Sequence, residues 1–106
     1  MREVAIVAAG MTRFGELWDL SLRDILVEAA SDALDAVKVD SLDSIIVGNM
    51  SAGQFVGQEH IGPLTADYLG MAGVAASRVE SACASGGIAL RAAFAEVASG
   101  LSDLVL

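Results

Sequence analysis

Short, mostly apolar segments recur along the chain and are separated by glycine-containing or polar stretches. These segments cover Val4–Ala9, Ser44–Val47, Ala76–Ser81 and a stretch that starts at about Asp103. Short apolar runs bounded by turn residues are typical of strands that are covered on both faces of a parallel sheet. The pattern therefore predicts four strands.

Apolar residues at helical spacing fill the longer stretches between these strands. The predicted helices cover about Ser21–Val37, Glu59–Leu69 and Ala84–Ser99. Ser21 followed by Asp24 resembles a capping box at the start of the first helix. Pro63 suits the first turn of the second helix, and Asn49–Gly57 is predicted to be a loop.

The predicted order is βαβαβαβ, which implies an α/β fold with a largely parallel sheet. The 19 alanines and 11 glycines among 106 residues favour closely packed layers. The mean hydropathy of +0.61 would suit a membrane protein. However, no window holds the roughly 18 apolar residues that a bilayer-spanning helix needs. We therefore expect no membrane association.

The charge of the chain argues against a nucleic-acid partner. The formal net charge is −8, and the six basic residues form no patch that could neutralise phosphates. The single cysteine excludes an internal disulfide framework and a multi-cysteine zinc site. With no export signal, we expect a cytoplasmic protein. Four acidic residues are expected at a solvated edge rather than around a metal ion: Asp32, Asp35, Asp40 and Asp43.

The length permits one domain at most. The last residues, Ser102–Leu106, have the pattern of a buried strand that has just begun, with no turn after it. A terminus inside a strand would leave backbone groups unpaired. We therefore expect the chain to be part of a longer protein.

The one cysteine, Cys83, lies where a predicted strand gives way to a predicted helix. The free N–H groups and the positive dipole end of a helix N-terminus stabilise a thiolate, which is the nucleophilic form of cysteine. Gly86 and Gly87 fall in the first turn, where each costs about 1 kcal/mol relative to alanine and leaves room near the sulfur. Cys83 is therefore a candidate nucleophile. The position is equally compatible with a small buried hydrophobic residue.

Two nucleotide-binding patterns are absent from the glycine-containing segments. No Gly-x-Gly-x-x-Gly stands at the first strand–helix turn, and Gly48–Gly57 contains no Gly-Lys-Ser/Thr. The glycines therefore predict neither a dinucleotide site nor a phosphate-binding loop.

The segment Glu80–Leu90 resembles the nucleophile segment of thiolases, whose hallmark is Cys-Ala-Ser-Gly at the start of a helix. Gly10–Gly15 resembles the corresponding segment in one branch of the thiolases. This branch includes sterol-carrier-protein thiolases and archaeal acetoacetyl-CoA thiolases (acetyl-CoA C-acetyltransferases). Val47–Asn49 and the loop after it resemble the segment that leads to the thiolase dimer contact. Related ketoacyl synthases more often carry Ala-Cys-Ser-Ser, so the cysteine segment favours a thiolase. The resemblance extends over essentially the whole chain, which corresponds to about the first quarter of a typical thiolase.

The resemblance implies that residues 1–106 form the N-terminal part of the thiolase N-terminal domain, within a five-layered αβαβα subunit. It also implies that Cys83 takes an acyl group from an acyl-CoA as a thioester. A second acetyl-CoA then attacks this thioester and gives acetoacetyl-CoA, so that one hard step becomes two easier ones. Coenzyme A thioesters are then the substrates, with no separate cofactor and no metal.

Further parts of the site and its partners also follow only from the resemblance. The catalytic histidines, a second acid–base residue and most of the CoA pocket belong to later segments of thiolases. We therefore assign no CoA-binding residue and expect no turnover by this chain alone. The resemblance implies a homodimer or homotetramer, and archaeal members suggest hydroxymethylglutaryl-CoA synthase as a partner.

Several other residues could either belong to the site or serve only the fold. His60 is expected at the surface or at a helix cap rather than in catalysis. Arg13 and Arg91 are candidates to meet a CoA phosphate, although Arg91 suits the solvent face of its helix equally well. Phe14 and Trp18 are expected to pack the first loop onto the body of the protein.

Two other classes of function stay compatible with the sequence. A thiolase-like protein could bind lipid or acyl-CoA, or hold another enzyme, without turnover. A self-contained 106-residue interaction protein would need a partner to cover its sheet edge and apolar faces. In either case the chain itself would be catalytically inert.

Overall fold

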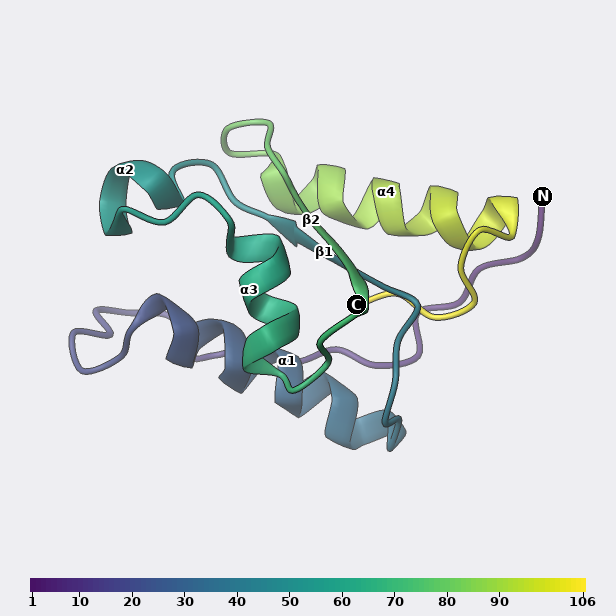
Figure 1. Ribbon diagram of the computed structural model, residues 1–106, viewed down its shortest axis with the longest axis horizontal. Helices are drawn as coiled ribbons and strands as arrows, with labels where there is room; N and C mark the ends of the chain where they lie inside the picture. Colours follow the sequence, from purple (N-terminus) through teal and green to yellow (C-terminus); the bar gives the residue numbers. More distant parts are fainter.

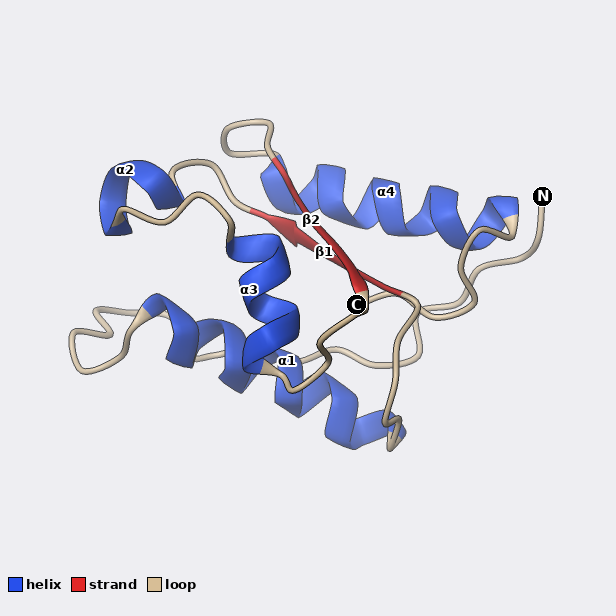
Figure 2. Ribbon diagram, in the orientation of Figure 1, coloured by secondary structure: helices blue, strands red, loops and turns tan.

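The computed structural model describes all 106 residues and places helices on both faces of a small parallel sheet (Figures 1 and 2). The elements are α1 (Leu22–Val37), β1 (Ser44–Gly48), α2 (Ala52–Val56), α3 (Ile61–Tyr68), β2 (Ala75–Val79) and α4 (Ser85–Ser99). α4 packs against one face of the sheet, whereas α3 and α1 lie on the other side (Figure 1). None of the helices combines the length and the apolar character needed to cross a bilayer.

The sheet confirms the predicted parallel pairing. β1 and β2 pair from Ser44 opposite Ala75 to Gly48 opposite Val79. On the other edge of β1, Ser44 forms an isolated parallel bridge with Val105. The expected fourth strand is thus reduced to this single bridge.

Helix α1 begins as the sequence predicts. The Ser21 hydroxyl accepts a hydrogen bond from the Asp24 N–H at 3.1 Å, and the Asp24 carboxylate accepts one from the Ser21 N–H at 2.8 Å. The Ser21 hydroxyl also donates to the Asp24 carboxylate at 2.6 Å, and this bond, together with the one from the Ser21 N–H, holds the pKa of Asp24 below its ordinary value. The helix ends at Lys38, whose backbone is left-handed and whose N–H donates to the Leu34 carbonyl.

The best-covered side chains lie between the sheet and α3. Ile45 of β1 and Ile61 of α3 are 1% and 2% exposed. Gly62 lets α3 approach β2 closely, because a Cβ there would lie 2.4 Å from the Ser77 carbonyl carbon. Only 12 of the 106 residues are buried, so most apolar side chains of the helices are only partly covered.

The prediction of a strand at Val4–Ala9 is wrong. The N-terminal stretch forms no regular element, and its one backbone hydrogen bond joins the Arg2 N–H to the Ala98 carbonyl. The reason is competition for the edge of β1. Leu106 already donates to the Ser44 carbonyl and accepts from the Ile46 N–H, so the apolar run stays extended without a strand partner.

Two expectations about loops also fail. The stretch Asn49–Gly57 contains the short helix α2, because the Asn49 side chain accepts a hydrogen bond from the Ala52 N–H at 2.7 Å. Phe14 and Trp18 do not pack the first loop onto the body, since they are 90% and 84% exposed. Trp18 instead donates to the nearby carboxylate of Glu16.

Candidate active site

β2 and α4 are joined by a tight turn, Glu80–Ala84, which carries Cys83. Figure 1 shows this turn as the loop between the end of β2 and the start of α4. The Cys83 residue is exposed, and its thiol takes part in no hydrogen bond. The alternative that Cys83 is a small buried hydrophobic residue is therefore wrong, and the thiol is accessible to a reagent or substrate.

Ala82, directly before the cysteine, has a left-handed backbone with φ of 47°. This conformation costs a non-glycine residue roughly 1–2 kcal/mol. The surrounding turn holds Ala82 on both sides, because its N–H donates to the Glu80 carboxylate and its carbonyl accepts from the Ser85 hydroxyl. Strained residues that are held in this way are frequent at functional sites.

The Ser85 hydroxyl is the centre of this turn. It accepts a hydrogen bond from the Ser81 N–H at 3.0 Å and donates one to the Ala82 carbonyl at 2.7 Å. The residue is only 5% exposed. This buried hydroxyl both donates and accepts a hydrogen bond, and so it fixes the backbone of Ser81 and Ala82, the two residues before Cys83.

A second feature, Gly48 at the end of β1, fixes where α4 begins. A Cβ at Gly48 would lie 2.4 Å from the Ser85 carbonyl oxygen and 2.9 Å from the Gly86 nitrogen. Only glycine therefore lets the carboxyl end of β1 approach the first turn of α4 so closely. Sheet and helix meet directly beside the cysteine-bearing turn.

The first turn of α4 is open toward solvent. Its N-cap residue, Ala84, provides no side-chain acceptor, and the N–H groups of Gly86 and Gly87 have no hydrogen-bond partner. A Cβ at either glycine would meet no atom within 4 Å. The arrangement thus places unpaired donors, positive dipole charge and free space next to an exposed thiol.

The other candidate residues, His60, Arg13 and Arg91, lie outside this turn. His60 is exposed at the N-cap of α3, where its side chain makes no capping hydrogen bond and its backbone N–H donates to the Gln58 side chain. Arg13 and Arg91 are both exposed. No group of three His, Cys, Asp or Glu side chains could hold a metal ion.

Arg78 of β2 is an anchoring residue that the sequence analysis missed. Its guanidinium donates to the carbonyl oxygens of Asn49 and Met50 and forms a 2.6 Å ion pair with Glu59. Glu59 in turn lies against Gly53, where a Cβ would collide with its carboxylate. An arginine in a strand next to the cysteine turn was the available signal, but its partners are distant in sequence.

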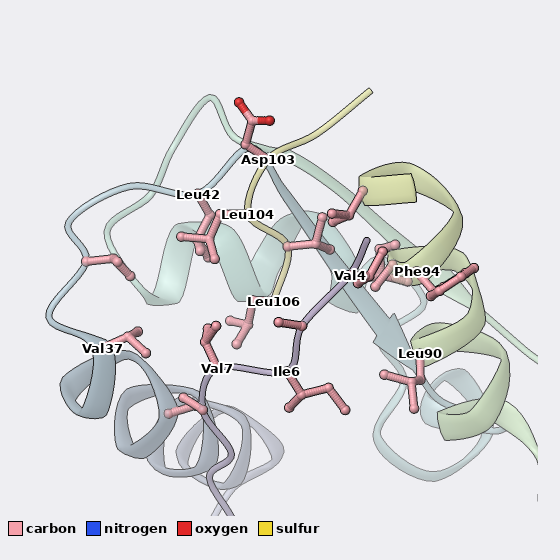
Figure 3. Close-up of a pocket in the computed structure, with 18 of the residues that line it drawn as sticks. Val4, Ile6, Val7, Val37, Leu42, Leu90, Phe94, Asp103, Leu104 and Leu106 are labelled. Carbon is pink, nitrogen blue, oxygen red and sulfur yellow. The ribbon is translucent and has the colours of Figure 1, made fainter. Parts of the chain in front are cut away.

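A hollow of about 690 Å³ lies away from Cys83. Figure 3 shows its walls: Val4 and Ile6 of the N-terminal stretch lie toward Phe94 and Leu90 of α4, whereas Val7 lies on the side of Leu106 and Val37. Almost all lining residues are apolar, and none belongs to Glu80–Ser85. Apart from Glu3 and Asp103 the lining is apolar and holds no cysteine, serine or histidine, so the hollow is not the candidate active site.

Comparisons with known proteins agree with this geometry. A family profile described as "Thiolase, N-terminal domain" matches residues 4–106. The chain is 54% identical, over its whole length, to the acetyl-CoA acetyltransferase of Methanocaldococcus jannaschii. It is 50% identical over its whole length to that of Methanothermobacter thermautotrophicus. A third relative, 37% identical over 99% of the chain, is the benzoylsuccinyl-CoA thiolase subunit BbsB of Thauera aromatica.

The chain spans 28% of the length of the two acetyltransferases and 27% of the thiolase subunit. Among solved structures, 3-oxoacyl-(acyl carrier protein) synthase III (FabH) of Pseudomonas aeruginosa matches with a TM-score of 0.67 and 26% identity. This match covers 80% of the present chain and 26% of the synthase. The predicted α/β fold class is thereby confirmed.

Proposed function

The chain belongs to the thiolase family, and from this premise we propose that it forms the nucleophile-bearing part of an acyltransferase that makes or cleaves acetoacetyl-CoA and related 3-ketoacyl-CoA. Two relatives that are 54% and 50% identical to the chain over its length are acetyl-CoA acetyltransferases. The observation that carries the proposal is the exposed Cys83 beside the open, unpaired first turn of α4.

The proposed first step is a thioester exchange at Cys83. The sulfur attacks the carbonyl carbon of acetyl-CoA, a new carbon–sulfur bond forms, and the bond to the CoA sulfur breaks. The CoA thiolate takes up the proton that Cys83 loses, so free CoA leaves and acetyl-Cys83 remains. The helix dipole favours this step because it stabilises the negative charge on the attacking sulfur.

The second step, attack by the methyl carbon of another acetyl-CoA, needs a base. No histidine, lysine or carboxylate makes a hydrogen bond to Cys83, so the proposal assigns to this chain only the acyl-accepting half of the reaction. Assembly into a homodimer or homotetramer and transfer of product to a hydroxymethylglutaryl-CoA synthase extend the proposal. So does a cytoplasmic location, which a free cysteine suits because cytosolic thiols stay reduced.

Intact-mass spectrometry after incubation with acetyl-CoA tests the acyl-accepting step. We expect one added acetyl group that hydroxylamine removes, because hydroxylamine cleaves thioesters and leaves amides intact. This control is sharp here, since Lys38 is the only lysine. The matched variant Cys83→Ala keeps the turn and should gain no hydroxylamine-sensitive acetyl group.

Two results would overturn the proposal. The first is a folded protein that acquires no hydroxylamine-sensitive acetyl group, which would favour a thiolase-like protein that binds acyl-CoA or another protein without turnover. The second is an adduct that persists in Cys83→Ala, which would remove Cys83 as the nucleophile.

A further inference from the structure

We propose that Ser85 is a positioning residue for Cys83: its buried hydroxyl holds Ala82 in the left-handed conformation and so fixes the cysteine at the N-terminus of α4. The role of Cys83 as the acyl acceptor rests on the function proposed above. The geometry of the turn does not. The two can therefore be tested separately.

The hydroxyl connects the two sides of the turn. Its contacts to the Ser81 N–H and the Ala82 carbonyl span the backbone on either side of the Ser81–Ala82 peptide. Neither of these groups belongs to a helix or a strand. Without the hydroxyl, the Ser81 N–H would lose its acceptor, and the Ala82 carbonyl would lose its side-chain donor.

Ala82 is the reason that this support matters. It is one of only two non-glycine residues in the chain with a positive φ; the other, Lys38, ends a helix. Without the hydroxyl, only the Glu80 carboxylate and the Ser85 N–H would still bond to Ala82, while the steric preference of alanine favours an ordinary conformation. Such a change at Ala82 would rotate the next residue, Cys83, away from the unpaired N–H groups of α4.

Ser85 does not act as a cap for these N–H groups. Its oxygen is engaged with Ser81 and Ala82, while the N–H groups of Gly86 and Gly87 stay unpaired. The serine therefore shapes the turn and leaves the donors of the helix N-terminus available to a ligand. This separates a positioning role from an ordinary capping role.

The test is the rate at which iodoacetamide alkylates Cys83, which is the only cysteine of the protein. Each variant is first shown to be folded by circular dichroism. At pH 7, Ser85→Ala should slow alkylation about two- to fivefold, because the thiolate loses its place in the helix dipole field. The matched control is Ser102→Ala. Ser102 is also a buried serine with a hydrogen-bonded hydroxyl, but it lies beyond the far end of α4.

A second variant keeps the proposal testable if Ser85→Ala folds poorly. Glycine adopts a positive φ without a steric penalty, so adding Ala82→Gly to Ser85→Ala should bring the alkylation rate back toward that of the wild type. A purely structural role for Ser85 would not predict rescue at its neighbour. Ser85→Thr, which retains the hydroxyl, should also keep the rate near the wild-type value.

Three outcomes would overturn the inference: an unchanged rate in folded Ser85→Ala, an equal loss in Ser102→Ala, or no rescue by Ala82→Gly. These readings do not involve CoA. If acetyl-CoA fails to acylate Cys83 but the alkylation pattern holds, only the proposed function is lost. If acylation occurs and the alkylation pattern is absent, only the role of Ser85 is lost.

Discussion

Two irregular regions of this chain are held in opposite ways. In the cysteine turn, Glu80–Ala84, the side-chain hydrogen bonds, including those of Ser85 at the start of α4, join residues no more than four positions apart. In the N-terminal segment, residues 1–20, the hydrogen bonds to the rest of the chain come from Arg2, whose guanidinium reaches Val97, Ser102 and Asp103, 95 to 101 positions away. The first region is organised by its own neighbours, and the second depends on the rest of the fold.

The two regions also differ in how far their side chains are buried. Ser85, whose hydroxyl holds the cysteine turn, is buried, whereas Phe14 and Trp18 of the N-terminal segment are almost completely exposed. Local hydrogen bonds cost little chain entropy to close, while contacts across a hundred residues cost more. A reactive group that must keep its geometry is therefore better placed in the first kind of region.

The largest expected effect on stability comes from a substitution that forces the end of β1 and the first turn of α4 apart. Gly48→Ala would place a Cβ against the Ser85 carbonyl, and overpacking of this kind lowers stability by about 1–3 kcal/mol. We expect a lower denaturant midpoint together with slower alkylation of Cys83. Chemical denaturation followed by circular dichroism measures the first quantity.

The control for this change is Gly86→Ala in the adjacent helix turn. A Cβ there meets nothing within 4 Å, so alanine should stabilise α4 by up to about 1 kcal/mol. If the free space beside the thiol admits substrate, the same variant should slow acetyl transfer. A destabilising Gly86→Ala, or a neutral Gly48→Ala, would contradict the packing described for this site.

A smaller effect is expected when the distant attachment is removed. Arg2→Ala loses exposed polar contacts and an exposed ion pair with Asp103, and such pairs contribute at most about 1 kcal/mol. Limited proteolysis within residues 1–20 should nevertheless become faster, because the hydrogen bonds that join this segment to the rest of the chain all come from Arg2. Alkylation of Cys83 should not change.

Arg13→Ala is the matched control, since Arg13 lies in the same segment, is exposed and donates no hydrogen bond. It should leave the rate of proteolysis in residues 1–20 unaltered. A slower reaction of Cys83 in Arg2→Ala would show that the two regions are coupled and that the cysteine turn is not held by its own neighbours alone.

The smallest expected effect is a pH dependence from another distant tie. The Asp43 carboxylate accepts hydrogen bonds from the backbone N–H groups of Asp103 and Leu104, which hold its pKa below the ordinary value. A carboxyl group whose pKa is lowered by folding stabilises the fold above its unfolded pKa, about 3.9. This stabilisation is lost as the pH falls through the folded pKa.

Thermal melts between neutral pH and pH 3 measure this dependence. The melting temperature should fall on acidification, and the fall should be smaller in Asp43→Asn. An identical pH profile in Asp43→Asn would mean that the contact with Asp103 and Leu104 does not contribute. Asp24, whose pKa is also lowered, accounts for part of the fall that persists in the variant.

The same contrast explains which features the sequence could predict. The capping box at Ser21 and Asp24, the strand at Ser44 and the helix after Cys83 all depend on residues close together in the chain. Their signals are therefore local and readable. The position of Cys83 between a strand and a helix N-terminus follows from the same local patterns.

The failures depend on choices between distant partners. Val4–Ala9 has the composition of a buried strand, but the edge of β1 is taken by Leu106, and no local pattern reports that competition. The anchoring of Arg78 across the sheet was hidden for the same reason. The Ser85 contacts are local, yet a serine in a first helical turn is too common to indicate that its hydroxyl supports a neighbouring left-handed residue.

The most direct test of the central claim compares the reactivity of Cys83 in the folded and the unfolded protein. If Cys83 is an activated nucleophile, the cysteine turn and the first turn of α4 make its thiol more reactive than an ordinary cysteine. Iodoacetamide should therefore alkylate Cys83 faster in native buffer than in concentrated urea at the same neutral pH. An equal or slower reaction in the folded protein would show that Cys83 is merely exposed, and would contradict its assignment as an activated nucleophile.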